Sequence, residues 1–314
     1  MLVKDIITEM ADVNKPLVNT HLADLTQLSS TNIKVFEQAW KKIELKHRRE
    51  IISRLTELAT DNYELNFDNI FINCLTDPDT DVRSEVINGL WENEEPVLIP
   101  LFIGLLNNDP AEKVQVTAAL ALGRFALMAE LRSISPKYGV QLAQALLNAT
   151  ADKNKSVEVR RRALEAVSPI STEQVKTAIK AAYESRDERL AISAVYAMGK
   201  NCDSKWLAFL LKELKNSDAE MRYEAATASG EIGDEDVAQY LLPVANDEDI
   251  DVRLAVIQAL GKIGGNEAKQ YLQKNVGDPN EAIRDAIETA LNEISIIDDM
   301  TVFEMAPQPE KHEN

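Results

Sequence analysis

The 314-residue sequence has few helix-breaking and few aromatic residues: 11 glycines, 11 prolines and 5% Phe, Trp and Tyr. Because Ala and Leu are abundant, this composition favours helices over β-sandwiches and β-barrels. Hydrophobic residues make up 45% of the chain, which excludes wholesale disorder. The two cysteines, Cys74 and Cys202, match no metal-binding or redox spacing and are expected to be reduced thiols. We expect no metal and no cofactor.

Long apolar runs and a secretory signal pattern are also missing. No apolar run reaches the ~18 residues that a membrane span requires. The residues that follow Met1 do not form a basic region, an apolar stretch and a cleavage site. The sequence therefore predicts a cytoplasmic protein that does not enter a membrane.

Basic residues are scarce relative to acidic ones, with 34 Lys and Arg against 52 Asp and Glu and a net charge of −18. Residues 201–314 alone hold 24 acidic and 10 basic side chains. Because affinity for phosphates comes mainly from Lys and Arg, we expect neither nucleic acid nor an anionic membrane as partner.

The stretch Lys41–Arg49 is the most basic in the chain. Two interpretations of it stay open, a solvated helix face and a site for an anionic partner.

What the sequence does contain is a tandem repeat. Equivalent positions fall at residues 83, 115, 160, 191, 222, 253 and 284, and their spacings are 32, 45, 31, 31, 31 and 31. Apolar residues at −1, +3 and +7 from this position lie on one face of a helix. Position +6 is always Gly or Ala, which lets a neighbouring helix approach closely. Glycine at +8 in four copies is expected to loosen or end the helix, and a shorter apolar helix precedes it in each repeat.

Short polar residues recur at position −6, in the turn before the longer helix. We expect them to bind free backbone N–H groups or the arginine of an adjacent repeat, which would tie the repeats together. The residues of this predicted ladder are Asp77, Arg83, Arg160, Arg222, Asp247, Arg253, Asp278 and Arg284.

The segment from Asp247 to Gly264, with Val252-Arg253 and Ala259-Leu260-Gly261 inside it, resembles the HEAT repeat. More narrowly, it is similar to the short bacterial form of the phycobilisome-lyase type. This resemblance implies an all-α, right-handed superhelix of antiparallel helix pairs, about seven repeats long, with the second helices on the concave side. An isolated pair of short helices leaves much apolar surface wet, so neighbouring repeats must stack.

The repeat also suggests how the chain is organised. We expect a helical N-terminal cap at 1–60, the repeat solenoid at 61–297 and an acidic, disordered tail at 298–314, which is a candidate peptide ligand for another protein. The spacing of 45 contains 14 extra residues near 127–140, which form either a lengthened helix or a binding loop.

The sequence favours a surface for binding over a catalytic centre. Its three histidines, His21, His47 and His312, form no catalytic or di-iron constellation. Positions +1 and +5 of the second helices are expected to be exposed, with Arg161 and Arg162 free to bind, while Trp91 is expected to pack in the stack. The candidate partner-binding residues are Asn88, Arg161, Arg162, Glu165, Tyr196, Tyr223 and Gln258.

We therefore predict a non-catalytic scaffold or adaptor that binds another protein with its concave face. The alternative, which the resemblance implies, is a lyase that acts on a bound tetrapyrrole or another prosthetic group.

Overall fold

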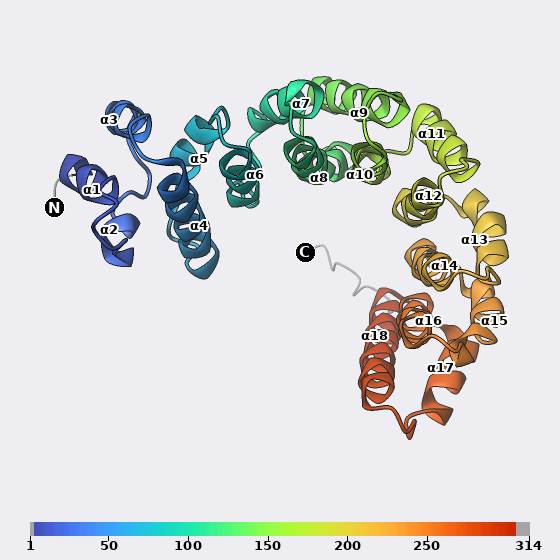
Figure 1. Cartoon of the computed structure of the whole chain (residues 1–314). Helices are drawn as coiled ribbons and strands as arrows, with labels where there is room; N and C mark the ends of the chain where they lie inside the picture. Colours follow the sequence, from blue (N-terminus) through green and yellow to red (C-terminus); the bar gives the residue numbers. More distant parts are fainter. Residues whose placement is uncertain (1–2, 306–314) are drawn as a thin grey trace, which may run out of the picture. The chain divides into compact units, whose positions relative to one another are not determined.

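A computed structural model describes residues 3–305, and for residues 297–305 it describes the backbone alone. The described residues form helices and connecting turns, with no strand among them. The chain divides into two compact units, Met1–Val167 and Ser168–Asn314. Both units are stacks of helices, as Figure 1 shows.

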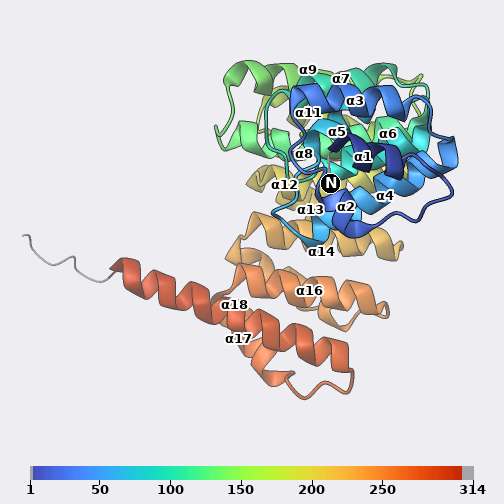
Figure 2. The same cartoon turned by 90° about the vertical axis from the view of Figure 1, so that its left-hand side faces the viewer.

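Residues 3–167, the described part of the first unit, form ten helices. They are α1 (Val3–Met10), α2 (Asn19–Ala23), α3 (Ser30–Trp40), α4 (Leu45–Asp61), α5 (Asp68–Cys74), α6 (Thr80–Gly89), α7 (Leu98–Asn108), α8 (Glu112–Glu130), α9 (Pro136–Ala151) and α10 (Val157–Val167). Helices α4, α6, α8 and α10 pack successively on one another and form one layer of the unit. Helices α3, α5, α7 and α9 form the other layer (Figures 1 and 2). We call α4, α6, α8 and α10 the second helices, because each follows its partner in the chain.

The second unit repeats this arrangement. Its helices are α11 (Glu173–Tyr183), α12 (Glu188–Asn201), α13 (Leu207–Glu213), α14 (Ala219–Ile232), α15 (Ala238–Leu241), α16 (Ile250–Ile263), α17 (Gly265–Lys274) and α18 (Glu281–Met305), with short 3₁₀ turns at Ser204–Trp206, Glu235–Val237 and Val244–Asn246. The second helices α12, α14, α16 and α18 pack successively on one another. Figure 2 shows that α18 extends beyond the end of α16.

Aspartates cap the start of the second helices α6, α12, α14 and α16. The side chain of Asp249 accepts hydrogen bonds from the backbone N–H groups of Asp251 and Val252, which the first turn of α16 leaves free. Asp79 caps α6 in the same way. Two residues earlier, the carboxylate of Asp247 accepts the N–H of Asp249 and shapes the turn. The polar residues at −6 and −4 thus form the turn and the cap together.

The glycines at +8 do not end the helices, contrary to our expectation. Gly199, Gly230 and Gly261 lie inside α12, α14 and α16. A Cβ at Gly230 would lie 2.7 Å from Cα of Ala259 in the next second helix, and the other two meet the next repeat equally closely. The helices end three residues later, where Cys202, Gly233 and Gly264 have positive φ. Glycine at +8 therefore serves close packing between consecutive second helices.

Three segments outside the regular spacing are also defined. The extra residues near 127–140 lengthen α8 and α9, with Pro136 at the first position of α9, where its missing N–H costs no hydrogen bond. Helix α18 continues to Met305, into the tail expected at 298–314, because the first helix breaker after Gly277 and Pro279 is Pro307. Residues 306–314 lie outside the described residues. The cap expected at 1–60 contributes α4, which packs on α6.

Candidate functional site

Three arginines of the predicted ladder bind the aspartate at −6 of the following repeat. The pairs are Arg83–Asp109, Arg222–Asp247 and Arg253–Asp278, with N–O distances of 2.7, 2.7 and 3.0 Å. Arg222 also donates to the carbonyl oxygen of Asn216 in its own repeat, at 2.9 Å. Its guanidinium holds the pKa of the Asp247 carboxyl below the usual value. These side chains join consecutive repeats and are not available to a ligand.

Two other predicted ladder residues, Arg160 and Arg284, make no described bond to the following repeat. Each donates to backbone carbonyl oxygens that precede its own helix. Arg160 donates to the carbonyl oxygen of Thr150 at 3.0 Å. Arg284 donates to the carbonyl oxygen of Asp278 at 2.8 Å. The remaining residue, Asp77, is buried and accepts a bond from an arginine of an earlier helix, Arg48.

Arg48 is a ladder residue that the sequence pattern did not reveal. It donates to Asp77 at 3.0 Å and to the carbonyl oxygen of Ile43 at 2.9 Å, as the later ladder arginines do. The residue before it is His47, not an aliphatic residue, so the −1 position of the repeat gave no signal. Trp40 adds a hydrogen bond from its indole N–H to Asp77 at 2.7 Å.

The basic stretch Lys41–Arg49 is therefore partly neutralised inside the protein. Besides the Arg48–Asp77 pair, Arg49 donates to both carboxylate oxygens of Asp79, at 2.9 and 2.6 Å. Both arginines bind aspartates of the next repeat. They are therefore not available to an anionic partner, which weakens that interpretation of the basic stretch.

The structure separates the candidate partner-binding residues into two groups. Asn88, Tyr223 and Gln258 are exposed, and Tyr196 is half-buried with the Lys200 ammonium 5.8 Å from its ring centre. Arg161 and Arg162, expected to be free, are not. Their spacing on α10 places them three and four residues from carboxylates, and they pair with Glu158 and with the candidate Glu165.

Trp91 differs most from our expectation, because it is 70% exposed instead of packed in the stack. It lies at position +8, where four of the other repeats have glycine, and follows the end of α6 at Gly89. In the regular repeats, the glycine at +8 touches the alanine at +6 of the next second helix. A tryptophan is too large for that contact, so its ring lies outside, and a hollow remains between the C-terminal end of α6 and the middle of α8.

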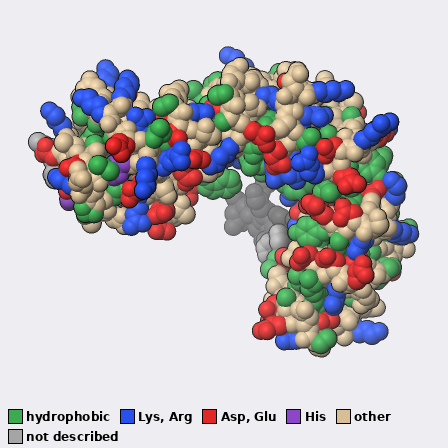
Figure 3. Space-filling view, viewed as in Figure 1, with side chains coloured by type: hydrophobic (Ala, Val, Ile, Leu, Met, Phe, Trp, Pro, Cys, Tyr) green, Lys and Arg blue, Asp and Glu red, His purple; other side chains and the backbone are tan. Residues whose placement is uncertain are grey.

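This hollow, which we call the Trp91 groove, has a volume of about 310 Å³. Its lining residues are Ile87, Asn88 and Trp91 from the end of α6, and Thr117, Leu120, Ala121 and Arg124 from α8. Leu120, Arg124 and Leu127 share one face of α8 by their spacing, and both leucines are exposed. Hydrophobic side chains are visible on the surface of both units in Figure 3. The candidate residue Asn88 belongs to this groove.

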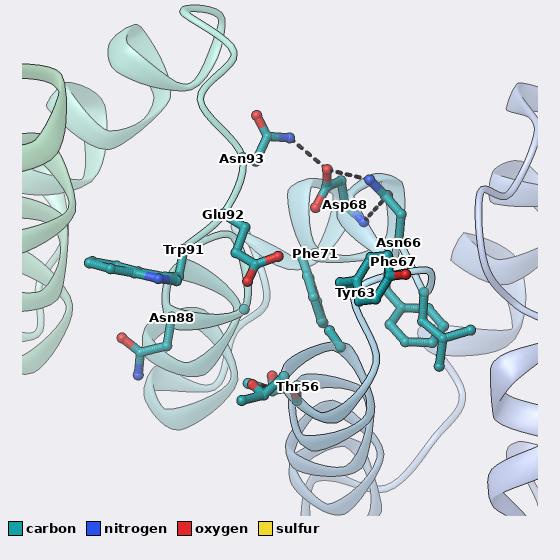
Figure 4. A pocket seen from close by; sticks show the side chains of 14 residues that line it. Thr56, Tyr63, Asn66, Phe67, Asp68, Phe71, Asn88, Trp91, Glu92 and Asn93 are labelled. Atoms are coloured by element: carbon teal, nitrogen blue, oxygen red, sulfur yellow. Dashed lines mark hydrogen bonds between the residues drawn. The ribbon is translucent and has the colours of Figure 1, made fainter. Parts of the chain in front are cut away.

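A second hollow of about 310 Å³ lies on the other side of Asn88 and Trp91 (Figure 4). It is formed by the end of α4, the following loop, α5 and the end of α6. Tyr63 at its edge is 86% exposed, and Phe71 lies at its base. In Figure 4 the Trp91 ring points away from Phe71 and Tyr63. Trp91 therefore stands as a ridge between two hollows of unit 1.

The guanidinium of Arg124 has an unusual environment for a charged group. Its three nitrogens are buried and have no hydrogen-bond partner among the described residues. Its Cζ lies 4.7 Å from the ring centre of Phe125. Burial lowers the pKa of Arg124, and the more distant carboxylates of Glu94 and Asp68 oppose that shift only in part. This cation is the one feature of the groove that lacks a counterpart within the described protein.

Neither a metal-binding cluster nor an activated thiol is present among the described residues. They contain no cluster of three or more His, Cys, Asp and Glu side chains that could hold a metal ion. Burial raises the pKa of the Cys74 thiol, and burial with the nearby Glu231 raises that of Cys202, so neither thiol is activated as a nucleophile. No described helix has the length and apolarity needed to cross a membrane.

Comparison with known proteins agrees with this geometry. A family model described as HEAT repeats matches residues 69–136 and 207–292. The fold is an all-α solenoid, and the two matched stretches are HEAT repeats, as the resemblance in the Asp247–Gly264 segment predicted. Among curated proteins, none matches the chain.

Solved structures share the fold at low sequence identity. The Escherichia coli protein YibA superposes with a TM-score of 0.50 at 17% identity, covering 82% of this chain and 91% of its own. Importin beta gives 0.53 at 11% identity over 95% of this chain, which spans 48% of importin beta. The CpcE–CpcF complex of phycocyanin lyase from Nostoc sp. PCC7120 gives 0.49 at 16% identity, covering 90% and 97%. At these identities the likeness of YibA and importin beta to this chain is one of fold alone.

Proposed function

We propose that this protein is a non-catalytic scaffold that binds another protein on the second-helix layer of unit 1, at the Trp91 groove. The observation that carries the proposal is the 70% exposure of Trp91 at a position where four other repeats have glycine. Large apolar side chains that are exposed together mark interaction sites, and Trp, Tyr and Arg contribute most to binding at protein interfaces. Trp91, Tyr63, Leu120 and Arg124 supply this set of side chains around two hollows.

The same surface suits a protein segment better than a small molecule. Both hollows are lined by the exposed Trp91, so a bound chain can cover this side chain and fill both hollows. Acidic side chains are prominent on unit 2 in Figure 3, which supports the expectation that nucleic acid is not the partner. The alternative function, a lyase acting on a tetrapyrrole or another prosthetic group, stays a prediction.

Affinity capture from an extract of the cells that express the protein tests the proposal. The wild type is compared with Trp91→Ala and with Tyr240→Ala, which removes an exposed aromatic side chain from α15 in unit 2. We expect Trp91→Ala to lose a captured partner that Tyr240→Ala retains, by about tenfold or more, because an aromatic anchor at an interface contributes ~2 kcal/mol or more. A double variant, Tyr196→Ala with Tyr223→Ala, tests the predicted contribution of unit 2. An identical set of proteins on the wild type and Trp91→Ala contradicts the proposed surface.

A further inference from the structure

We infer that Arg124 binds a carboxylate of the partner, and that the Trp91 groove takes a peptide segment in which Asp or Glu is adjacent to a large apolar side chain. The inference rests on the proposed function and names the chemistry of the partner segment.

The first argument is the contrast between Arg124 and the other buried arginines. Arg83 and Arg222 each make two hydrogen bonds to one carboxylate and further bonds to backbone carbonyl oxygens. Arg124 has buried nitrogens and no hydrogen bond within the described chain. A buried charge without a partner is costly, whereas a planar guanidinium binds a carboxylate through two parallel hydrogen bonds. We therefore assign an external carboxylate as the hydrogen-bond partner of the Arg124 guanidinium.

The second argument is that no described carboxylate near the groove makes a hydrogen bond with Arg124. Asp68 accepts hydrogen bonds from the side-chain amides of Asn66 and Asn93, at 2.9 and 2.7 Å. Glu94 is exposed and influences Arg124 only at longer range. The Phe125 ring, at 4.7 Å, offers a cation–π contact but no hydrogen-bond acceptor of carboxylate strength.

The third argument is the surface beside Arg124. Leu120 precedes Arg124 by one helical turn and is 49% exposed, while Trp91 and Ala121 line the same groove. An apolar side chain of the partner can cover Leu120 and Trp91 while its acidic neighbour reaches the guanidinium. Excluding water in this way strengthens the charged hydrogen bond. One cation surrounded by apolar side chains suits one carboxylate, so we assign the occupant as an acidic–apolar segment of another protein.

The probe for this inference is a library of random 12-residue peptides displayed on phage and selected against the full-length protein. We expect the wild type to enrich peptides in which Asp or Glu is next to Leu, Ile, Met, Phe or Trp. Arg124→Met keeps an unbranched side chain over Phe125 but removes the charge. Selection against this variant should lose the acidic preference and keep the apolar one. Failure of the wild type to enrich acidic–apolar peptides overturns the inference.

A double-mutant cycle then isolates the Arg124–carboxylate contact. With a labelled enriched peptide, fluorescence anisotropy should show about tenfold weaker binding for Arg124→Met, and the same loss when the peptide's acid is changed to its amide on the wild type. The amide change should have no further effect on Arg124→Met, and Arg124→Lys should recover part of the affinity. Equal losses on the wild type and Arg124→Met would show that Arg124 only packs in the structure.

Two results separate this inference from the proposed function. If Trp91→Ala abolishes peptide binding while Arg124→Met leaves the acidic preference unchanged, the surface is correct and the carboxylate contact is wrong. If Trp91→Ala binds the peptides as the wild type does, the proposed surface itself fails. The chain has an acidic–apolar segment of its own at residues 298–305. Arg124-dependent binding of a peptide of residues 298–309, stronger than any library peptide, would overturn the assignment to another protein.

Discussion

The step from α14 to α16 in unit 2 and the step from α6 to α8 in unit 1 join equivalent helices in different ways. In unit 2, Gly230 lies against Ala259, so closely that an added Cβ would be 2.7 Å from a backbone atom. In unit 1 the equivalent residues are Trp91 and Ala121, and both line an open groove. Where glycine occupies position +8, consecutive second helices bury each other's surface. Where tryptophan replaces it, part of that surface stays exposed and is available to a partner.

The two steps nevertheless share one connection. Arg83 binds Asp109 at the start of the α6–α8 step, as Arg222 binds Asp247 at the start of the α14–α16 step. Both ion pairs lie near the N-terminal ends of the second helices, eight residues before the glycine or tryptophan. The α6–α8 step is therefore held together at one end and open at the other. This arrangement keeps the groove on a rigid support, which favours binding with little loss of entropy.

The largest expected difference between the two regions concerns their leucines. Leu260 of α16 is fully buried, and Leu260→Asp places a charge inside the stack of unit 2. We expect a loss of more than about 4 kcal/mol in the free energy of unfolding, measured by urea denaturation. The matched change Leu120→Asp, on the exposed groove face of α8, should alter stability by less than about 0.5 kcal/mol. Similar losses for both variants would remove the distinction between a buried array and an open groove.

The next effect concerns the ion pairs that both steps share. Asp247→Asn leaves the buried guanidinium of Arg222 without its carboxylate and should cost about 3 kcal/mol at neutral pH. The folded-state pKa of Asp247 lies below its value of 3.8 in a model compound, chiefly because Arg222 donates hydrogen bonds to it. The carboxylate therefore stabilises the protein fully above pH ~4, and this contribution is lost as the pH falls through the folded-state pKa.

Urea denaturation at several pH values checks this sign. The stability difference between the wild type and Asp247→Asn should be constant from pH 7 to about pH 5 and shrink below pH ~4. As a control, Glu37→Gln breaks the solvent-exposed pair with Lys41, and its effect on stability should be much smaller than that of Asp247→Asn because water screens the exposed charges. A difference that grows on acidification would contradict the assigned role of the ion pair.

Several features of this molecule could be predicted from sequence because they repeat. The spacing of 31, the apolar positions and the small residue at +6 predicted stacked helix pairs, and the polar residue at −6 pointed to the Arg222–Asp247 type of contact. Arg48 was missed because His47 replaces the aliphatic residue that marks the pattern. The exposure of Trp91 was missed because an apolar residue next to a repeat helix is usually buried. Only the contact in space between position +8 and position +6 of the next second helix shows why a tryptophan does not fit between α6 and α8.

The pairing of Arg161 and Arg162 could have been predicted and was not. Glu158 and Glu165 lie three or four residues from these arginines on the same helix, a spacing that favours ion pairs. The orphan guanidinium of Arg124, in contrast, has no sequence signal. Its isolation depends on the fold, because neither of the two carboxylates that influence its pKa, Glu94 and Asp68, makes a hydrogen bond with it.

A smaller effect compares the same substitution at two glycines. Gly230→Ala brings a methyl group to 2.7 Å from the backbone of Ala259 and should destabilise the protein by about 1–3 kcal/mol. Gly104→Ala, inside α7 of unit 1, meets no atom within 4 Å and should stabilise by about 0.5–1 kcal/mol through helix propensity. Urea denaturation of both variants gives the two signs. If Gly230→Ala is neutral or stabilising, close packing is not the reason for glycine at +8.

The smallest expected change in stability is at Trp91 itself. Trp91→Phe should alter the free energy of unfolding by less than about 0.5 kcal/mol, because the side chain packs against little. Its fluorescence should nevertheless change strongly. Trp40 and Trp206 are 5% and 2% exposed, so the variant keeps only buried tryptophans. We expect the emission maximum to move to shorter wavelength and acrylamide quenching to fall. An unchanged emission spectrum together with a loss of more than about 1 kcal/mol would mean that Trp91 is packed, and the α6–α8 step would then be closed like the steps of unit 2.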